Sequence, residues 1–300
     1  MKKNKAHSLI ELSVVLIIIG VMIAGVIGVR ALVDSSRIAN SKSITKASVV
    51  PNINGLVAWY ETSSSESFLS SQRSDGTQVT SWYDINPISI PSKKNTLVAN
   101  SGSVTYLKNG IGNLPSLQFS SANDSGFSDF LLSSFDKGKS NSNTIFVVFS
   151  QKTRDSTGNT IRNLISNPSS GTNGVVKIGY RDNGSSDSIT MEATSLVESS
   201  STNIPTISDN LSIIAAFYYD RAYSKGYVNN ASNPSGGGYL SNPGNNSLAG
   251  LVLGSSSQNN TRFVGLISEV IIYDRPLKKN ERIDVLRYLS KKYNITVSGT

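Results

Sequence analysis

The sequence predicts a mainly β chain, in which a long transmembrane α-helix precedes an antiparallel β-sandwich with a C-terminal helix. Residues 9–29 form an apolar run with a single acidic side chain. From residue 56 onward, short apolar runs alternate with loops rich in Ser, Asn and Gly, which is typical of strands joined by polar turns. Helical periodicity returns in residues 277–293, so strands and helices are not interleaved as an α/β fold requires.

The composition indicates a folded chain and excludes several kinds of catalysis. Of 300 residues, 38% are hydrophobic and 16% are charged. There is no cysteine, and the single histidine is His7. The remainder of the chain therefore lacks the side chains for a Ser-His-Asp triad, a Cys-His dyad or the usual His/Cys zinc site. The net charge of +8 is interpreted as a solubility feature.

The N-terminal apolar run has the length of a membrane anchor. As a helix, Leu9 to Val29 would be about 30 Å long, enough to cross the hydrocarbon core. Lys2, Lys3 and Lys5 precede it, so the positive-inside rule keeps the N-terminus cytoplasmic. A secretory signal peptide is the rival interpretation, but its apolar region is usually about 7 to 15 residues long.

Glu11 is the ionisable side chain within this run. A carboxylate at mid-depth in a membrane costs roughly 2.5 to 3.5 kcal/mol on insertion scales. Two interpretations follow: Glu11 reaches water at the membrane surface, or it meets a cation that is buried with it.

The stretch "AHSLIELSVVLIIIG", residues 6–20, resembles the cleavage and methylation segment of type IV prepilins and pseudopilins. The resemblance implies that prepilin peptidase cuts between Ala6 and His7 and methylates the new amine. The family usually has Gly before the cut and Phe after it. Glu11 would become the fifth mature residue, whose carboxylate attracts the N-terminal amine of a neighbouring subunit during filament assembly.

Three regions are expected: a leader peptide at 1–6, a transmembrane and assembly helix at 7–50, and a head at 51–300. Pro51 is expected to stop the helix, because proline cannot continue one. Three glycines in the helix would allow close packing against other pilin helices. They are Gly20, Gly25 and Gly28.

The head is expected to consist of strands followed by one helix. The clearest strand-like runs are residues 56–61, 143–150, 174–180, 188–194, 211–219, 250–255 and 263–274. In residues 277–293, helical spacing places four apolar residues on one face with cations opposite, which predicts a solvated basic face. The four are Ile283, Leu286, Leu289 and Tyr293. Glu281 would lie in the first turn, where the helix dipole favours an anion.

A series of short segments resembles the laminin-G-like, concanavalin A-like jelly roll over residues 52–295. They are "LVAWYETS", "DGTQVTSWYD", "IGNLPSLQF", "KGYVNN", "LVLGS" and "FVGLISEVIIYDRPLKKNERIDVLRYLSKKY". The resemblance implies that Trp59 and Trp82 pack in the core instead of stacking on sugars. It also implies a hydrogen-bonded structural role for Glu269.

No catalytic acid pair is predicted. A glycosidase needs two carboxyl groups within about 10 Å of each other. The closest candidates, Glu192 and Glu198, would lie some 20 Å apart along an ideal strand. The chain is therefore not expected to be an enzyme, and a glycan-active enzyme is the disfavoured alternative.

No cofactor is predicted, although related folds often bind calcium and this alternative is left open. No stretch matches the EF-hand pattern. The candidate oxygen ligands are Asp75, Asp124, Asp182, Asn183, Asp187 and Asp220. Nucleic acid is not expected as a partner, because the basic face of residues 277–293 is interpreted as a solvated helix surface.

The sequence thus predicts a minor pilin or pseudopilin subunit of a type IV pilus or type II secretion filament, whose lectin-like head serves adhesion or ligand binding. The alternative is a membrane-anchored carbohydrate-binding module that does not assemble. Expected partners are prepilin peptidase, other pilin or pseudopilin subunits, the inner membrane, and glycans or another cell-surface ligand. The expected location is the bacterial inner membrane, with a single pass and a periplasmic head, followed by the pilus or pseudopilus and the cell surface.

Overall fold

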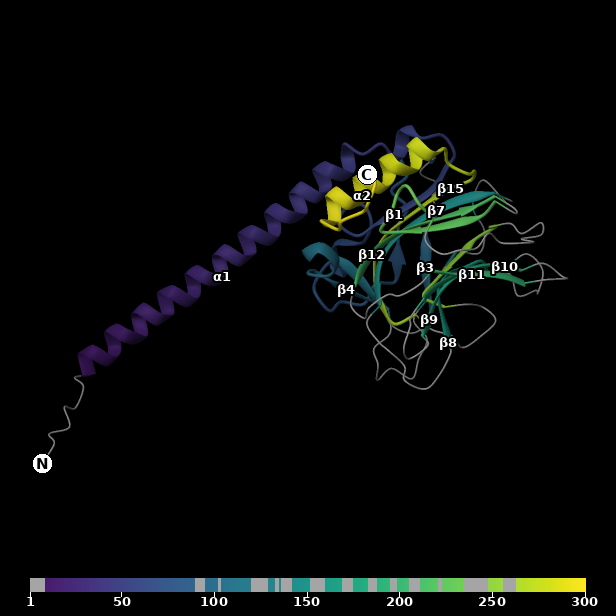
Figure 1. Ribbon diagram of the computed structural model, residues 1–300. Helices are drawn as coiled ribbons and strands as arrows, with labels where there is room; N and C mark the ends of the chain where they lie inside the picture. Colours follow the sequence, from purple (N-terminus) through teal and green to yellow (C-terminus); the bar gives the residue numbers. More distant parts are fainter. Residues whose placement is uncertain are drawn as a thin grey trace, which may run out of the picture.

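The computed structural model describes residues 9–89, 95–101, 104–119, 129–132, 135, 142–151, 160–168, 175–182, 188–194, 199–204, 211–220, 223–234, 248–255 and 263–300. A long helix, α1 (Leu9–Lys46), leads into a β-sandwich, and a second helix, α2 (Lys279–Tyr293), lies on the outside of the sandwich. Figure 1 shows α1 as a rod whose C-terminal end lies beside α2.

Most of α1 extends away from the sandwich (Figure 1). Its described apolar side chains from Ile10 to Ile23 are exposed, and Val21 is 67% exposed. Among the residues that the structure describes, no helix combines the length and the apolar character that a membrane crossing requires.

The C-terminal end of α1 is tightened before the chain enters the head. The helix ends at Lys46, short of the predicted boundary. The amide of Ser48 donates to the carbonyl of Thr45, a bond of the 3-10 type that closes the last turn. Pro51 then lies near the start of a separate 3-10 helix, η1 (Val50–Asn52), where a missing amide hydrogen costs no hydrogen bond.

The described strands form two antiparallel sheets. Sheet A has seven strands in the order β13-β12-β7-β15-β5-β4, with β1 also paired to β15. Sheet B has eight strands in the order β11-β10-β9-β8-β14-β6-β3-β2. The strands of sheet A are β1 (Leu56–Glu61), β4 (Val104–Leu107), β5 (Ser116–Phe119), β7 (Asn143–Gln151), β12 (Ser212–Tyr219), β13 (Lys225–Val228) and β15 (Gly265–Tyr273). Those of sheet B are β2 (Ser81–Trp82), β3 (Leu97–Ser101), β6 (Asp129–Leu132), β8 (Thr160–Ser166), β9 (Val175–Asp182), β10 (Ser188–Thr194), β11 (Ser199–Ile204) and β14 (Leu251–Leu253).

The predicted antiparallel sandwich is confirmed, and each strand-like run of the sequence contains a strand. The pattern missed strands with few apolar residues, such as β11, whose sequence is SSSTNI. β11 exists because its backbone pairs with β10 along its whole length. Such pairing depends on the neighbouring strand, so the sequence of the paired strand alone gives little indication of it.

Sheet A is buried on both faces. An inner core fills the space between the sheets and contains Tyr60, Trp82, Phe119, Phe130 and Phe149. On the other face, Phe146 and Tyr273 of the sheet belong to a second apolar cluster with Leu286 and Leu289 of α2. β7 and β15 are therefore buried at every position, and each contains an uninterrupted apolar run, IFVVF in β7 and VIIY in β15.

A β-bulge in β15 directs one acidic side chain toward α2. The register between β15 and β7 shifts between Ile267 and Glu269. Ile267 and Val270 both belong to the inner core although they lie three positions apart, because the bulge inserts one extra residue. Glu269 consequently lies on the outer face, under α2.

The predicted C-terminal helix is present as α2, with Glu281 in its first turn. The Glu281 carboxylate accepts a hydrogen bond of 2.8 Å from the Lys278 amide, which caps the helix. Both guanidinium NH groups of Arg275 also donate to it, at 2.7 and 2.9 Å. The hydrogen bond from Arg275 is the main reason why the pKa of Glu281 is lowered.

The prediction that the cations of α2 all lie on a solvated face is wrong. Arg282 and Lys292 are both 6% exposed and belong to the buried side of the helix. Arg282 stacks over the ring of Tyr227, with its Cζ atom 3.9 Å from the ring centroid. Lys292 is buried because two carboxylates lie beneath it.

Candidate functional site

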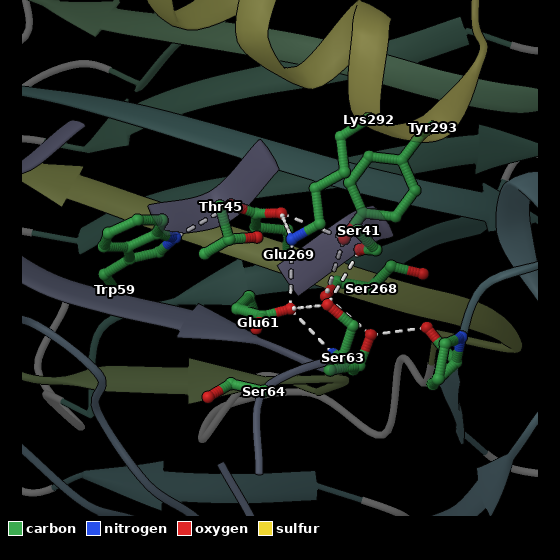
Figure 2. Close-up of polar contacts among 12 residues, drawn as sticks. Ser41, Thr45, Trp59, Glu61, Ser63, Ser64, Ser268, Glu269, Lys292 and Tyr293 are labelled. Atoms are coloured by element: carbon green, nitrogen blue, oxygen red, sulfur yellow. Dashed lines mark hydrogen bonds and ion pairs between the residues drawn. The ribbon is translucent and has the colours of Figure 1, made fainter. Parts of the chain in front are cut away.

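A buried group of three charged side chains joins three elements of the outer layer. Glu61 ends β1, Glu269 follows the bulge of β15, and Lys292 lies near the end of α2; together they are called the Glu–Lys–Glu cluster here. Glu61 and Glu269 are register partners in the antiparallel pair, so their side chains point to the same face of sheet A. Figure 2 shows the Lys292 ammonium between the two carboxylates.

The distances in the cluster are those of charged hydrogen bonds. Lys292 Nζ lies 2.7 Å from Glu269 Oε2 and 3.0 Å from Glu61 Oε2. All three side chains are 0% exposed. The Coulomb attraction is therefore little screened, and removal of Lys292 would leave two buried carboxylates without a cation.

Glu269 has a full set of donors besides Lys292. Trp59 Nε1 and the Tyr288 hydroxyl donate to its Oε1 atom, at 2.8 and 2.7 Å. The Tyr293 hydroxyl donates to Oε2, at 2.9 Å. The structural, hydrogen-bonded position that the resemblance implied for Glu269 is therefore present.

Glu61 is hydrogen-bonded through one of its two carboxylate oxygens. The backbone amide and the hydroxyl of Ser63 both donate to Glu61 Oε2, at 2.7 and 2.8 Å. Glu61 Oε1, in contrast, is buried and has no hydrogen-bond partner among the described residues. The two carboxylates thus differ: one is saturated with donors, and the other keeps one oxygen unoccupied.

Burial and charge together set the pKa values in this layer. Burial lowers the pKa of Lys292, but Glu269 and Glu61 outweigh this effect, so its pKa is raised and its charged form is favoured. Burial raises the pKa of Tyr288 and of Tyr293 well above the ordinary value, and the nearby carboxylates raise both further. Both phenols therefore remain hydrogen-bond donors at neutral pH.

The cluster also contacts the C-terminal end of α1. Ser41 and Ser63 hydroxyls lie 2.8 Å apart, and because the Ser63 hydrogen goes to Glu61, Ser41 is the donor. The Thr45 hydroxyl lies 3.4 Å from that of Tyr288. Ser41 and Thr45 are 2% and 7% exposed, so this end of α1 is part of the same buried layer.

The structure brings together an acid pair that the sequence analysis did not consider. Glu61 and Glu269, far apart in sequence, are brought to the same ammonium, whereas Glu198 lies outside the described residues. The sequence signal that could have found this pair is an acidic residue in each of two otherwise apolar strands. As both carboxylates are fully buried and neutralised in part by Lys292, they are not placed to meet a polysaccharide substrate.

The predicted assembly residues fall largely outside what is described. Ala6 and His7 precede the described residues, and Glu11 lies in α1 with its side chain outside them. Gly20, Gly25 and Gly28 all lie within α1. No atom of the described residues lies within 4 Å of a Cβ atom added at Gly20, so there is space for a neighbouring helix at this position.

The two tryptophans are buried, as predicted: Trp59 is 3% and Trp82 is 0% exposed. Of the calcium candidates, Asp75 accepts the amide of Lys108. Asp220 accepts the Tyr218 hydroxyl. Asp182 is the last residue of β9, while three candidates lie outside the described residues: Asp124, Asn183 and Asp187. Within the described part of the chain, no three His, Cys, Asp or Glu side chains gather as metal ligands.

Comparison with known families identifies the N-terminal segment. A family model described as the prokaryotic N-terminal methylation motif matches residues 1–27. The match contains Ala6, His7 and Glu11 and ends within α1. The chain therefore begins with a prepilin-type methylation motif, as the resemblance indicated. No curated protein matches the sequence.

Solved structures confirm the sandwich fold of the head. A GH54 α-L-arabinofuranosidase is 11% identical with a TM-score of 0.54, over 72% of this chain and 51% of that one. The binding domain of Paraclostridial Mosquitocidal Protein 1 is 11% identical with a TM-score of 0.52, over 79% and 52%. The binding domain of botulinum neurotoxin DC in complex with SialylT is 12% identical with a TM-score of 0.50, over 79% and 51%. This chain thus spans about half the length of these three structures.

Proposed function

We propose that this protein is a minor pilin or pseudopilin, a non-enzymatic subunit of a type IV pilus or type II secretion filament. The observation that carries this proposal is the methylation motif at residues 1–27, which continues directly into α1 and then into a β-sandwich head. The leader would be removed after Ala6, and the apolar half of α1 would lie in the inner membrane and later among other pilin helices. Lipid or neighbouring helices would then bury the exposed apolar side chains of α1.

Glu11 would have a specific role in this assembly. It lies near the start of α1, where the methylated amine of a neighbouring subunit would supply the positive charge that a carboxylate in an apolar bundle needs. The glycines of α1 would let neighbouring helices approach closely.

The head would display a binding surface outside the membrane. The similar botulinum neurotoxin DC domain was solved with SialylT, which supports glycans as one class of ligand. The buried state of the Glu61 and Glu269 pair supports binding without hydrolysis. The partners would then be prepilin peptidase, other pilin subunits and a glycan or other cell-surface ligand.

Mass spectrometry of the protein from cells with an active prepilin peptidase tests this proposal. We expect a mature chain that starts at His7 with a methylated amine, and co-purification with other pilin subunits. Glu11→Ala should be processed but excluded from filaments. An intact Met1 terminus would contradict the proposal, and a processed chain found without pilin partners would favour a tethered binding module instead.

A further inference from the structure

We propose that Lys292 and Glu269 become joined by an amide bond, so that α2 is covalently linked to β15. The structure places the Lys292 nitrogen 2.7 Å from Glu269 Oε2, in direct contact with the carboxyl group. Such a fixed approach replaces an encounter in solution and lowers the entropic part of the barrier. The overall step balances without an oxidant or a further reactant, since an ammonium and a carboxylate condense to an amide and one water.

Glu61 is positioned to move the protons. Its Oε2 atom lies 3.0 Å from Lys292 Nζ, and its Oε1 atom has no hydrogen-bond partner in the described part of the chain. Lys292 would give one proton to Glu61 and become an amine, and its lone pair would then attack Cδ of Glu269. The new C–N bond forms as one oxygen of Glu269 leaves with two protons, one directly from the nitrogen and one returned by Glu61. Glu61 ends the reaction as a carboxylate.

Three donors would stabilise the intermediate of this reaction. Trp59 Nε1 and the Tyr288 hydroxyl point at Glu269 Oε1, and the Tyr293 hydroxyl points at Oε2. Negative charge stays on these oxygens when the carbon becomes tetrahedral. Donors that are already in place stabilise such charge without reorganisation, as in an oxyanion hole.

Amide formation would remove one ion pair from the buried layer. Lys292, Glu61 and Glu269 are 0% exposed, so the layer holds two negative charges and one positive charge away from water. An amide removes one charge of each sign, and with them the desolvation cost of that ion pair. The remaining Glu61 carboxylate would lose its cation and be held by its two hydrogen bonds from Ser63.

Intact-mass measurement of the denatured full-length protein tests the bond. We expect a mass lower than that of the chain by one water, with N-terminal processing accounted for. Trypsin should release a branched peptide that joins residues 263–278 to residues 292–300, since the acylated Lys292 is no longer cleaved. An unmodified mass for the folded wild-type protein, with both peptides released separately, would overturn the proposal.

Variants of Lys292, Glu61 and Glu269 test the role of each residue in the reaction. Lys292→Arg should abolish the mass loss, whereas Lys291→Arg, at an exposed neighbour, should retain it; thermal unfolding checks that each is folded. Glu61→Gln should leave the chain unlinked, and a fully linked Glu61→Gln chain would refute its role as proton carrier. Glu269→Gln should yield the same branched peptide with loss of ammonia in place of water. A persistent loss of water in Glu269→Gln would place the bond on another carboxyl group and refute this assignment.

Discussion

At the scale of single residues, the charge of Lys292 is stabilised by Glu61, Glu269 and the hydroxyl of Tyr288 instead of by water. The side chain is fully buried, so its ion pairs carry a large desolvation cost that their geometry must offset. The cluster therefore depends on its single cation more than on either carboxylate.

Lys292→Met should strongly destabilise the head. The substitution fills a similar volume but leaves two carboxylates buried without a cation, which costs roughly 3 to 5 kcal/mol. Lys291→Met is the matched control, because Lys291 is the exposed neighbour in the same helical turn. Urea unfolding of the full-length protein in detergent should show a loss for Lys292→Met and little change for Lys291→Met. Equal stabilities would contradict the role assigned to Lys292.

At the scale of elements, α2 is held against sheet A at its C-terminal end by backbone contact as well as by the cluster. The 3-10 helix η4 (Ile111–Asn113) packs beneath it, and Gly112 has a φ angle of 62°, which favours glycine. A Cβ atom at Gly112 would collide with the carbonyl group of Tyr293. The absence of a side chain at this position therefore lets α2 lie close to the sheet.

Gly112→Ala should destabilise the head more than Gly76→Ala. Both glycines have positive φ angles, so each alanine would carry a backbone cost of about 1 to 2 kcal/mol. Within the described part of the chain, nothing lies within 4 Å of a Cβ atom at Gly76, so the difference between the two variants isolates the collision with Tyr293. Thermal unfolding measures it, and identical melting temperatures would show that α2 does not depend on this contact.

At the scale of the whole molecule, α1 and the head form one continuous unit. Ser41 and Thr45 are buried against the layer that contains the cluster, and the Tyr273 hydroxyl donates to the carbonyl of Val50 at 3.0 Å. Figure 1 shows the result, with the end of α1 alongside α2 while the remainder projects away. In a filament, this attachment would fix the direction in which each head points.

Spin-label distances should show this fixed attachment. The chain has no native cysteine, so Ser36→Cys on α1 and Ser74→Cys in the head give two unique labelling sites, both exposed. We expect a narrow distance distribution in detergent and a broader one when Ser41→Ala and Thr45→Ala remove the buried contacts. A broad distribution in the otherwise native protein would show that the head moves freely on the helix.

The sequence by itself determined the features that depend on local patterns. The methylation motif around Glu11, the long helix, the apolar strands and the C-terminal helix with Glu281 in its first turn could all be recognised in consecutive residues. Polar strands such as β11 could not, because strand pairing supplies what their sequence lacks.

Only the tertiary structure decided which charged residues meet. The strand register places Glu61 beside Glu269, and a bulge directs Glu269 to the outer face of sheet A. The packing of α2 on this face brings Lys292 into contact with both carboxylates. Helical spacing alone assigned Lys292 to solvent, since periodicity records the face of a residue but not what lies opposite it. Long-range electrostatic partners are fixed by packing, and one sequence carries no local signal for them.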